Sequence, residues 1–398
     1  MEKRDRTANR YFCLLQASMF CNMAVYSGFF SVILGRLGFD SSMIAQTATV
    51  ISVCSMLCTP VLGRLCDRLR ITRSLFLAAA VLAPVSLYFI LHSTSFFGTL
   101  FWSAVFVSFC LRSQIMNAGW IAALNSTGYH LSFAVSRGMG SLSFALGSIL
   151  IGVVMDRVGL EFLPLLVVVF SALMALAVLL LPPQPDIPAQ SGTGSTAEGL
   201  KVLSRNRGYM VLVLCSFLYT IPNHAFATFF PVYFEEQGGS SSLLGVAMFI
   251  MAVSEVPVML GYGRLEKRFG ADRLMVVSLL TYGVKSLLVT CFRSPLVICA
   301  CMPLQAFALG LGIPTCQRLI AQLIEPAYSS TAQTTWSAAS EGLGGIFSSL
   351  LCTFLVNVMD MKGLLRFTAL FSLTGTVIYV VYLKKRTAHT GKEAGIVR

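Results

Sequence analysis

Long uninterrupted runs of apolar residues decide what this chain can fold into. Each is close to the ~20 residues that an α-helix needs to cross a bilayer. We count twelve, near 11–35, 43–63, 74–92, 97–123, 137–155, 162–181, 208–234, 243–263, 274–292, 295–317, 334–358 and 364–383. The runs are continuously apolar rather than alternating, so a membrane β-barrel is not expected. We therefore predict an all-α membrane protein with twelve transmembrane helices.

The composition supports a membrane protein. The chain is 56% hydrophobic and 12% charged, whereas soluble domains are about 45–50% apolar and about 25% charged. The cysteines lie mostly inside the apolar runs, where a thiol behaves as a small hydrophobic group rather than as part of a disulfide scaffold. The first run is longer than the about 7–15 apolar residues of a cleaved signal peptide. We therefore expect it to remain as the first span.

The basic residues predict the orientation. With both termini in the cytoplasm, the inner segments hold 21 of the 29 Lys and Arg residues, and the outer loops hold five. Basic residues gather in cytoplasmic loops, so this distribution is the expected one for an even number of spans. The net charge of +12 is then a topological signal and implies no nucleic-acid partner. We predict a multi-pass protein of the cytoplasmic (plasma) membrane.

A polar stretch divides the spans into two sets of six. Residues 182–207 are rich in Pro, Gly, Ser and Thr, a composition typical of a flexible linker. We therefore predict an N-terminal six-helix bundle at 1–181, a cytoplasmic linker at 182–207, a C-terminal six-helix bundle at 208–383 and a basic cytoplasmic tail at 384–398.

The two sets of spans are related by an internal repeat. Shifting the sequence by 200 residues makes 12 of 45 positions identical between 29–73 and 229–273, without gaps. Shared membrane composition accounts poorly for the matching loop pattern G-R-L-x-x-R. We interpret the repeat as a duplication of a six-helix unit. Duplicated halves are typical of solute transporters, which bind the solute near the membrane midplane between the halves and expose it to each side in turn.

The loop after the second span resembles a signature of the major facilitator superfamily. Its sequence Gly63-Arg-Leu-Cys-Asp67-Arg68 is similar to the G-x-x-x-D-R/K pattern of that family, with a weaker copy at Gly263-Arg264-Leu-Glu-Lys-Arg268. The resemblance extends over the whole chain in span count, linker and repeat. It implies a major facilitator fold, in which this gating loop holds the two halves together in the outward-facing state. An alternative interpretation is that the loop carries only a topology signal.

Three further stretches resemble the lactose-permease and phenylpropionate-permease branch. They are a Gly- and Ser-rich segment that begins at Ser136-Arg137, the Ser-Glu255-Val context of span 8, and Lys285 in span 9. The chain also departs from the lactose type. An acidic sugar-binding residue of that branch falls at Gly119, and its proton-handling His and Glu fall at Gln305 and Ala308.

Five charged residues lie inside the predicted spans, namely Arg112, Arg137, Glu255, Lys285 and Glu341. A charge at the centre of a membrane helix costs about 2.5–3.5 kcal/mol on insertion scales, so such residues are candidates for function. Their excess of one positive charge suggests an anionic solute, bound through paired hydrogen bonds to arginine. The alternative is that the charges pair with one another. Four uncharged polar residues in the same spans could form hydrogen bonds with the solute or with neighbouring helices. They are Asn22, Asn117, His224 and Gln305.

The acidic members of this set are candidates for proton coupling. Burial makes a carboxyl group hold its proton more tightly, so Glu255 and Glu341 could load and release a proton near neutrality. His224 is a further candidate, because histidine titrates in that range without help. A single histidine in a helix is also often a packing residue.

The chain carries no recognisable cofactor, metal or nucleotide motif, including the P-loop pattern of ATP-driven pumps. We therefore expect no enzyme and no cofactor. The expected function is secondary active transport of a small organic solute, namely a sugar, a nucleoside or an aromatic carboxylate. We expect a monomer that takes up the solute together with a proton. Drug or metabolite efflux is the alternative, although span 5 lacks the Pro of the Gly/Pro-rich efflux signature.

Overall fold

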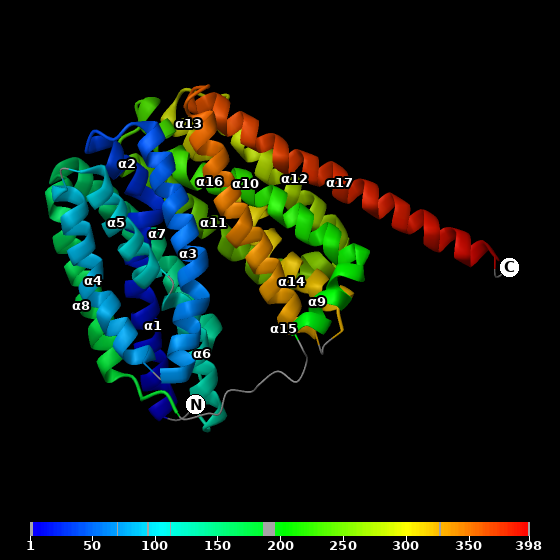
Figure 1. Ribbon diagram of the computed structural model, residues 1–398, viewed down its shortest axis with the longest axis horizontal. Helices are drawn as coiled ribbons and strands as arrows, with labels where there is room; N and C mark the ends of the chain where they lie inside the picture. The colour runs from blue at the N-terminus through cyan, green and yellow to red at the C-terminus, as the bar shows by residue number, and fades with distance from the viewer. Residues whose placement is uncertain are drawn as a thin grey trace. The chain divides into compact units, whose positions relative to one another are not determined.

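The structure, a computed structural model, describes residues 3–69, 71–93, 95–111, 113–185, 196–325 and 328–396. Within these ranges the regular elements are all helical. Contacts divide the chain into two units, residues 1–191 with 231–253 and residues 192–230 with 254–398. Figure 1 follows the chain through its helices.

Unit 1 contains most of the first half of the sequence. Its helices are α1 (Lys3–Ala24), the π-helical η1 (Val25–Phe29), α2 (Phe30–Arg36), α3 (Ser41–Leu69), α4 (Thr72–His92), α5 (Phe96–Phe106), the π-helical η2 (Val107–Leu111), α6 (Ser113–Ser126), α7 (Phe133–Arg157), η3 (Leu160–Phe162) and α8 (Leu163–Leu180). Helix α1 packs along α7 and α8, and α4 packs along α8 and α5. Trp120, fully buried, meets the rings of Phe12 and Phe76 at 5.7 and 6.0 Å in the core.

Unit 2 contains most of the second half. Its elements are α9 (Thr196–Arg205), α10 (Arg207–Glu236) up to residue 230, α11 (Ser241–Phe269) from residue 254, α12 (Ala271–Val289), α13 (Pro295–Ala300), the π-helical η4 (Ala306–Gly310), α14 (Leu311–Leu323), α15 (Ser329–Ser337), the π-helical η6 (Ala338–Leu343), α16 (Gly344–Leu355) and α17 (Met361–Ile396). Helix α12 packs against α17 and α14. The remaining parts of α10 and α11 belong to unit 1.

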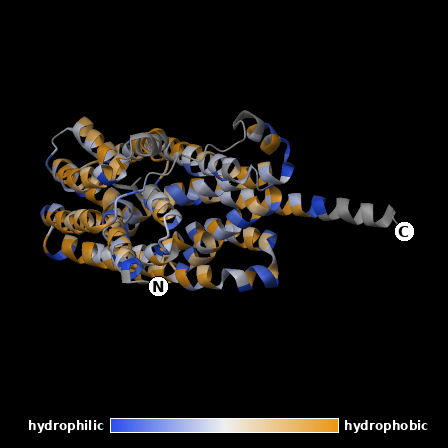
Figure 2. Ribbon diagram, turned by 90° about the horizontal axis from the view of Figure 1, so that it is seen from below, coloured by the Kyte–Doolittle hydropathy of each residue, from blue (hydrophilic) through white to orange (hydrophobic). Residues whose placement is uncertain are grey.

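The predicted all-α membrane fold is confirmed. Every predicted span coincides with helix in the described residues, and nine helices there are long and apolar enough by themselves to cross a membrane. Spans 1, 4, 10 and 11 are each interrupted by a π-helical segment. Large apolar side chains lie on the outside, for example Leu165 (61% exposed) and Leu176 (48% exposed) on α8. Figure 2 shows the hydrophobic colour along the helices of both units, as expected for surfaces covered by lipid.

The predicted linker contains a helix that the sequence analysis did not anticipate. Residues 196–205 form α9, of which Leu203 is 2% exposed and belongs to the core of unit 2. Gly199 lies against Thr331 of α15. Apolar side chains on one face of this short segment give it a surface to bury, and burial outweighs the weak helix propensity of its Gly and Ser.

The turns that join spans 1 and 2 and spans 7 and 8 have the same structure. Gly38 and Gly238 end their helices with φ of 89° and 84°, a left-handed conformation that favours glycine. The following residues bond back alike, Phe39 N–H to Leu34 O and Gly239 N–H to Phe234 O. The next helices begin with matching side-chain caps, from Asp40 to Met43 N–H and from Ser240 to Leu243 N–H. These equivalent turns, 200 residues apart, support the duplication.

Helices α7 and α11 approach closely within unit 1. A Cβ atom at Gly152 would clash with the carbonyl oxygen of Ser241, and one at Gly245 would clash with that of Ser148. Asp156 accepts hydrogen bonds from the N–H groups of Ser241 and Ser242, at 3.1 and 2.6 Å, and so caps the start of α11.

A cluster of charged groups surrounds that cap. Arg36, at the end of α2, donates to Glu235 Oε1 and to Ser241 Oγ, both at 2.6 Å. Its Nη2 also lies 3.7 Å from Asp156 Oδ1. Helices from both sequence halves therefore meet in unit 1 through this cluster.

Gly152→Val tests the backbone contact between α7 and α11. The added side chain meets a carbonyl oxygen that cannot rotate away, and overpacking of this kind costs about 1–3 kcal/mol. We expect a lower midpoint of thermal unfolding in detergent. Gly138→Ala on the same helix is the control, because a Cβ there meets nothing within 4 Å. Equal midpoints for the two variants would contradict the close contact.

Candidate functional site

Lys285 is a charged side chain buried inside unit 2. It lies on α12, is 1% exposed, and donates a hydrogen bond of 2.5 Å to Gln305 Oε1. Its ammonium also lies 3.9 Å from the ring centroid of Phe226 on α10. An amide oxygen and an aromatic face thus replace part of the hydration of the cation.

The backbone around Gln305 explains how the amide reaches Lys285. Gln305 immediately precedes η4, a π-helical segment, and such segments often occur at functional sites. Ser278 Oγ on α12 donates to Ala308 O in this segment at 2.6 Å, which ties the two helices together. Gly310 lets η4 approach the backbone of Glu255 on α11. Lys285 thus binds the residue just before η4, and Glu255 packs on the residue that ends it.

Two stacked tyrosines extend this cluster. Tyr282 lies one turn before Lys285 on α12, and its ring stacks on that of Tyr219 with centroids 4.8 Å apart. Its buried hydroxyl has no hydrogen-bond partner among the described residues. Unit 2 therefore brings Glu255, Lys285 and Gln305 to one region with an aromatic lining, whereas Glu341 is exposed within η6.

Unit 1 holds a second polar group. Asn117 on α6 is fully buried and donates to Gln16 Oε1 on α1. Asn22, further along α1, donates to Ser171 Oγ at 3.3 Å. The Oδ1 atoms of Asn117 and Asn22 are buried and have no partner among the described residues. Because a buried unsatisfied oxygen costs about 1–3 kcal/mol, each is a candidate acceptor for a solute hydroxyl.

Arg137 on α7 lies next to this amide pair. Its Nη1 donates to Ser141 Oγ at 2.8 Å, and its guanidinium lies 4.4 Å from the ring centroid of Phe20 on α1. Gly140 makes the approach of α1 possible, because a Cβ there would lie 2.9 Å from Gln16 Cγ. Gln16 and Asn117 thus meet in the core of unit 1, and the exposed Arg137 packs on Phe20, one turn further along α1.

The other predicted site residues belong to neither of these two polar groups or lie outside the described residues. His224 on α10 packs its ring on Gly345 of α16. Arg112 lies outside the described residues, and so do the side chains of Gly63, Asp67 and Arg68 near the end of α3. In the second copy of the loop, a Cβ at Gly263 would meet nothing, Arg264 is exposed, and Arg268 lies over the ring of Phe269. In the same segment of sequence, Glu266 forms an ion pair with Arg318, with Oε1 and Nε 2.5 Å apart.

The sequence analysis missed the aromatic members of both groups, Phe20, Tyr219, Phe226 and Tyr282. Aromatic residues are abundant in this chain, with 29 Phe and 12 Tyr, so most fill the core or face lipid. One available signal was the spacing of Tyr282 and Lys285, which places both on one side of α12.

Comparison with known proteins assigns the family. The model of the MFS_1 like family matches residues 12–367. The chain belongs to this major facilitator family. A maltose permease of Geobacillus stearothermophilus is 25% identical over 342 residues, which cover 86% of this chain and 85% of that protein. An uncharacterised transporter, YwbF, of Bacillus subtilis (strain 168) is 24% identical over 301 residues, 69% of this chain and 72% of that one.

The solved structures agree on the fold. A crystal structure of the nucleoside transporter NupG has a TM-score of 0.78 at 16% identity, covering 95% of this chain and 99% of that one. A bacterial homologue of the lysosomal transporter Spinster has a TM-score of 0.69 at 13% identity, covering 96% and 97%. This major facilitator protein is therefore a multi-pass membrane transporter of small solutes, as the sequence resemblance implied.

Gln305→Leu tests whether the amide supports Lys285. Losing the acceptor of a hydrogen bond from a buried charged group should cost about 1.5–3 kcal/mol. We expect a clear fall in the midpoint of thermal unfolding, and a smaller fall for the double variant Lys285→Met/Gln305→Leu, which removes both partners. Additive losses in the double variant would show that the two side chains act independently.

Proposed function

We propose that this transporter takes up a small hydroxylated ring compound, a sugar or a nucleoside, together with a proton. The observation that carries the proposal is the buried Lys285–Gln305 pair beside the rings of Phe226 and Tyr282. Solute sites combine mostly apolar, often aromatic, walls with a few placed polar groups. The names of the relatives, a maltose permease and a nucleoside transporter, agree with this class of solute.

The polar groups of unit 1 support a solute with several hydroxyl groups. Asn22 and Asn117 each offer an amide oxygen that lacks a partner in the described structure, and Arg137 offers donors from a group already oriented by Ser141 and Phe20. A hydroxyl group can both donate and accept, so it can satisfy either kind of partner. A purely apolar solute would leave the two amide oxygens without a hydrogen bond.

Glu255 is the proposed proton carrier. It is half-buried on α11, beside the backbone of η4, and Lys285 binds the residue just before η4. A carboxyl group that exchanges a proton next to a buried ammonium changes the net charge of the cluster by one. That change can couple protonation to solute binding and to the rocking of the two halves.

An anionic solute, such as an aromatic carboxylate, is the second candidate. Arg137 and Lys285 are both basic, and a guanidinium binds a carboxylate through two parallel hydrogen bonds. Glu255 opposes this alternative, because it brings negative charge to the same region of unit 2 as Lys285.

Uptake by Arg137→Gln separates the two solute classes. Wild-type protein in proteoliposomes should accumulate neutral sugars or nucleosides in preference to aromatic carboxylates. Loss of a hydrogen bond from a charged group should lower neutral uptake by about 10- to 100-fold. Arg293→Gln, in an exposed loop, is the matched control and should retain uptake. Preferential uptake of carboxylates, lost in Arg137→Gln, would favour the anionic class.

Glu255→Gln tests the coupling. We expect this variant to lose accumulation driven by a pH gradient while it retains solute exchange at equal pH, because only the proton site has been removed. Glu161→Gln, exposed in η3, is the control. The proposal is wrong if gradient-driven accumulation is unchanged in Glu255→Gln, and a loss in Glu341→Gln alone would identify Glu341 as the carrier instead.

A further inference from the structure

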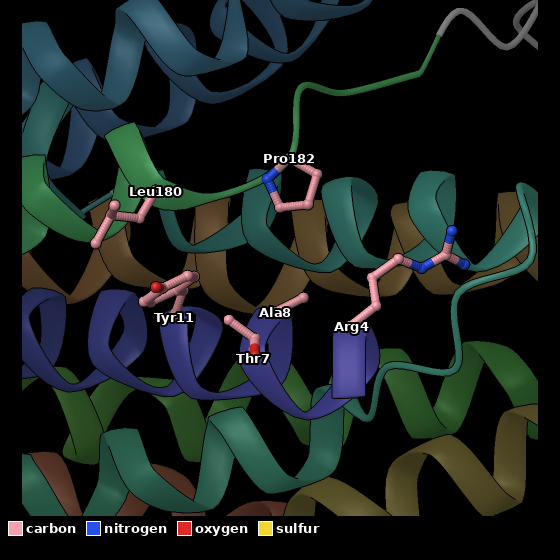
Figure 3. Close-up of a pocket in the computed structure, with 6 residues that line it drawn as sticks. All are labelled: Arg4, Thr7, Ala8, Tyr11, Leu180 and Pro182. Atoms are coloured by element: carbon pink, nitrogen blue, oxygen red, sulfur yellow. The ribbon is translucent and has the colours of Figure 1, made fainter. Parts of the chain in front are cut away.

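Unit 1 has an open groove between the start of α1 and the end of α8. Its volume is about 380 Å³, and it is lined by Arg4, Thr7, Ala8, Tyr11, Leu180 and Pro182. Figure 3 shows Arg4 at one end of the groove and the ring of Tyr11 at the other, with Leu180 and Pro182 opposite α1. Most of the lining is apolar, and the basic group stands at one end.

Arg4 lines this groove, Arg73 binds the backbone next to the lining residue Leu180, and backbone carbonyls orient both arginines. Arg4 Nη2 donates to Gly128 O at 3.1 Å, and its guanidinium lies 3.9 Å from the ring centroid of Tyr129. Arg73, at the start of α4, donates to Leu179 O at 2.5 Å, next to the lining residue Leu180. A guanidinium has five N–H donors, so these bonds leave capacity for an anion. Asp5, beside Arg4, is 1% exposed and is not part of the lining.

The position of the groove along the helices indicates its surroundings. The apolar spans Arg4–Arg36 and Leu160–Leu180 both end here, so the groove lies at the level where lipid headgroups meet the acyl chains. On α8, Leu173, Leu176 and Leu180 are 39%, 48% and 46% exposed. Their spacing places them on one face of the helix, and this face continues from the groove towards the apolar middle of the span.

We propose that the groove binds one acidic phospholipid. The phosphate lies between Arg4 and Arg73, the polar headgroup reaches the Thr7 and Tyr11 hydroxyls, and an acyl chain follows the exposed leucines of α8. Basic pockets between transmembrane helices on the cytoplasmic side bind acidic headgroups, and this is the face that the distribution of basic residues predicts to be cytoplasmic. The apolar lining favours a lipid over a free phosphate ion, which would leave most of the groove empty.

Lipid binding to the full-length protein tests the proposal. Native mass spectrometry of detergent-purified protein should show one tight site for phosphatidylglycerol and weaker binding of phosphatidylcholine. Each of Arg4→Gln and Arg73→Gln should weaken phosphatidylglycerol binding about fivefold, since one basic residue near anionic lipid contributes about 1 kcal/mol. Arg10→Gln is the control, because Arg10 is exposed on α1 but does not line the groove.

A second variant keeps both arginines and fills the groove. Thr7 is exposed, so Thr7→Trp should fold normally and lose the tight site. The proposal is overturned if Thr7→Trp or the double variant Arg4→Gln/Arg73→Gln binds phosphatidylglycerol as wild type does. It is also overturned if inorganic phosphate binds as tightly as the lipid, which would identify a site for the free ion.

Discussion

The need to stabilise the ammonium of Lys285 inside an apolar helix bundle governs the centre of unit 2. A charge at that depth costs several kcal/mol unless the protein replaces its hydration. Three groups take the place of water around the ammonium. They are the amide of Gln305 before η4, the ring of Phe226 on α10 and the carboxylate of Glu255 on α11. Each of these groups reaches Lys285 only if its helix lies close to α12. The packing of these helices therefore also forms the site.

The π-helical segments provide the local geometry that this packing needs. In a membrane every backbone polar group must find a partner within the protein, and a π-helical turn changes which carbonyls remain available. At η4, Ser278 Oγ binds the carbonyl of Ala308 and thereby compensates for the irregularity. Asn22 lies three residues before η1, Gln305 directly precedes η4, and Glu341 lies within η6. Three of the candidate residues therefore lie at or near positions where the helices depart from regular geometry.

The sequence predicted the parts of the fold that depend on periodicity and composition. The spans follow from apolar length, and the repeat follows from a match at fixed spacing; the structure adds that the matched Gly38 and Gly238 form equivalent turns. Pairings across long separations could not be predicted, such as Gln16 with Asn117 or Arg36 with Glu235. The sequence shows Arg36 only as one of the five basic residues of the predicted outer loops. Its partner Glu235 is 199 residues away and could not be inferred. The charged candidate residues were predicted because a charge inside a membrane helix is costly. Their aromatic neighbours could not be predicted, because the sequence does not distinguish them from the many other aromatic residues of the spans.

The duplication retained turns and changed the polar interior. At the same shift of 200 residues, Glu255 corresponds to Ser55, Lys285 to Val85 and Arg137 to Ser337. The glycine turns are kept in both halves because their left-handed backbone admits few other residues. The charged residues lack this constraint, and a charge inside a membrane helix adds an insertion cost. The amides of Gln16 and Asn117 in unit 1, and the ammonium of Lys285 beside an aromatic ring in unit 2, therefore show that the polar chemistry of the two halves has diverged.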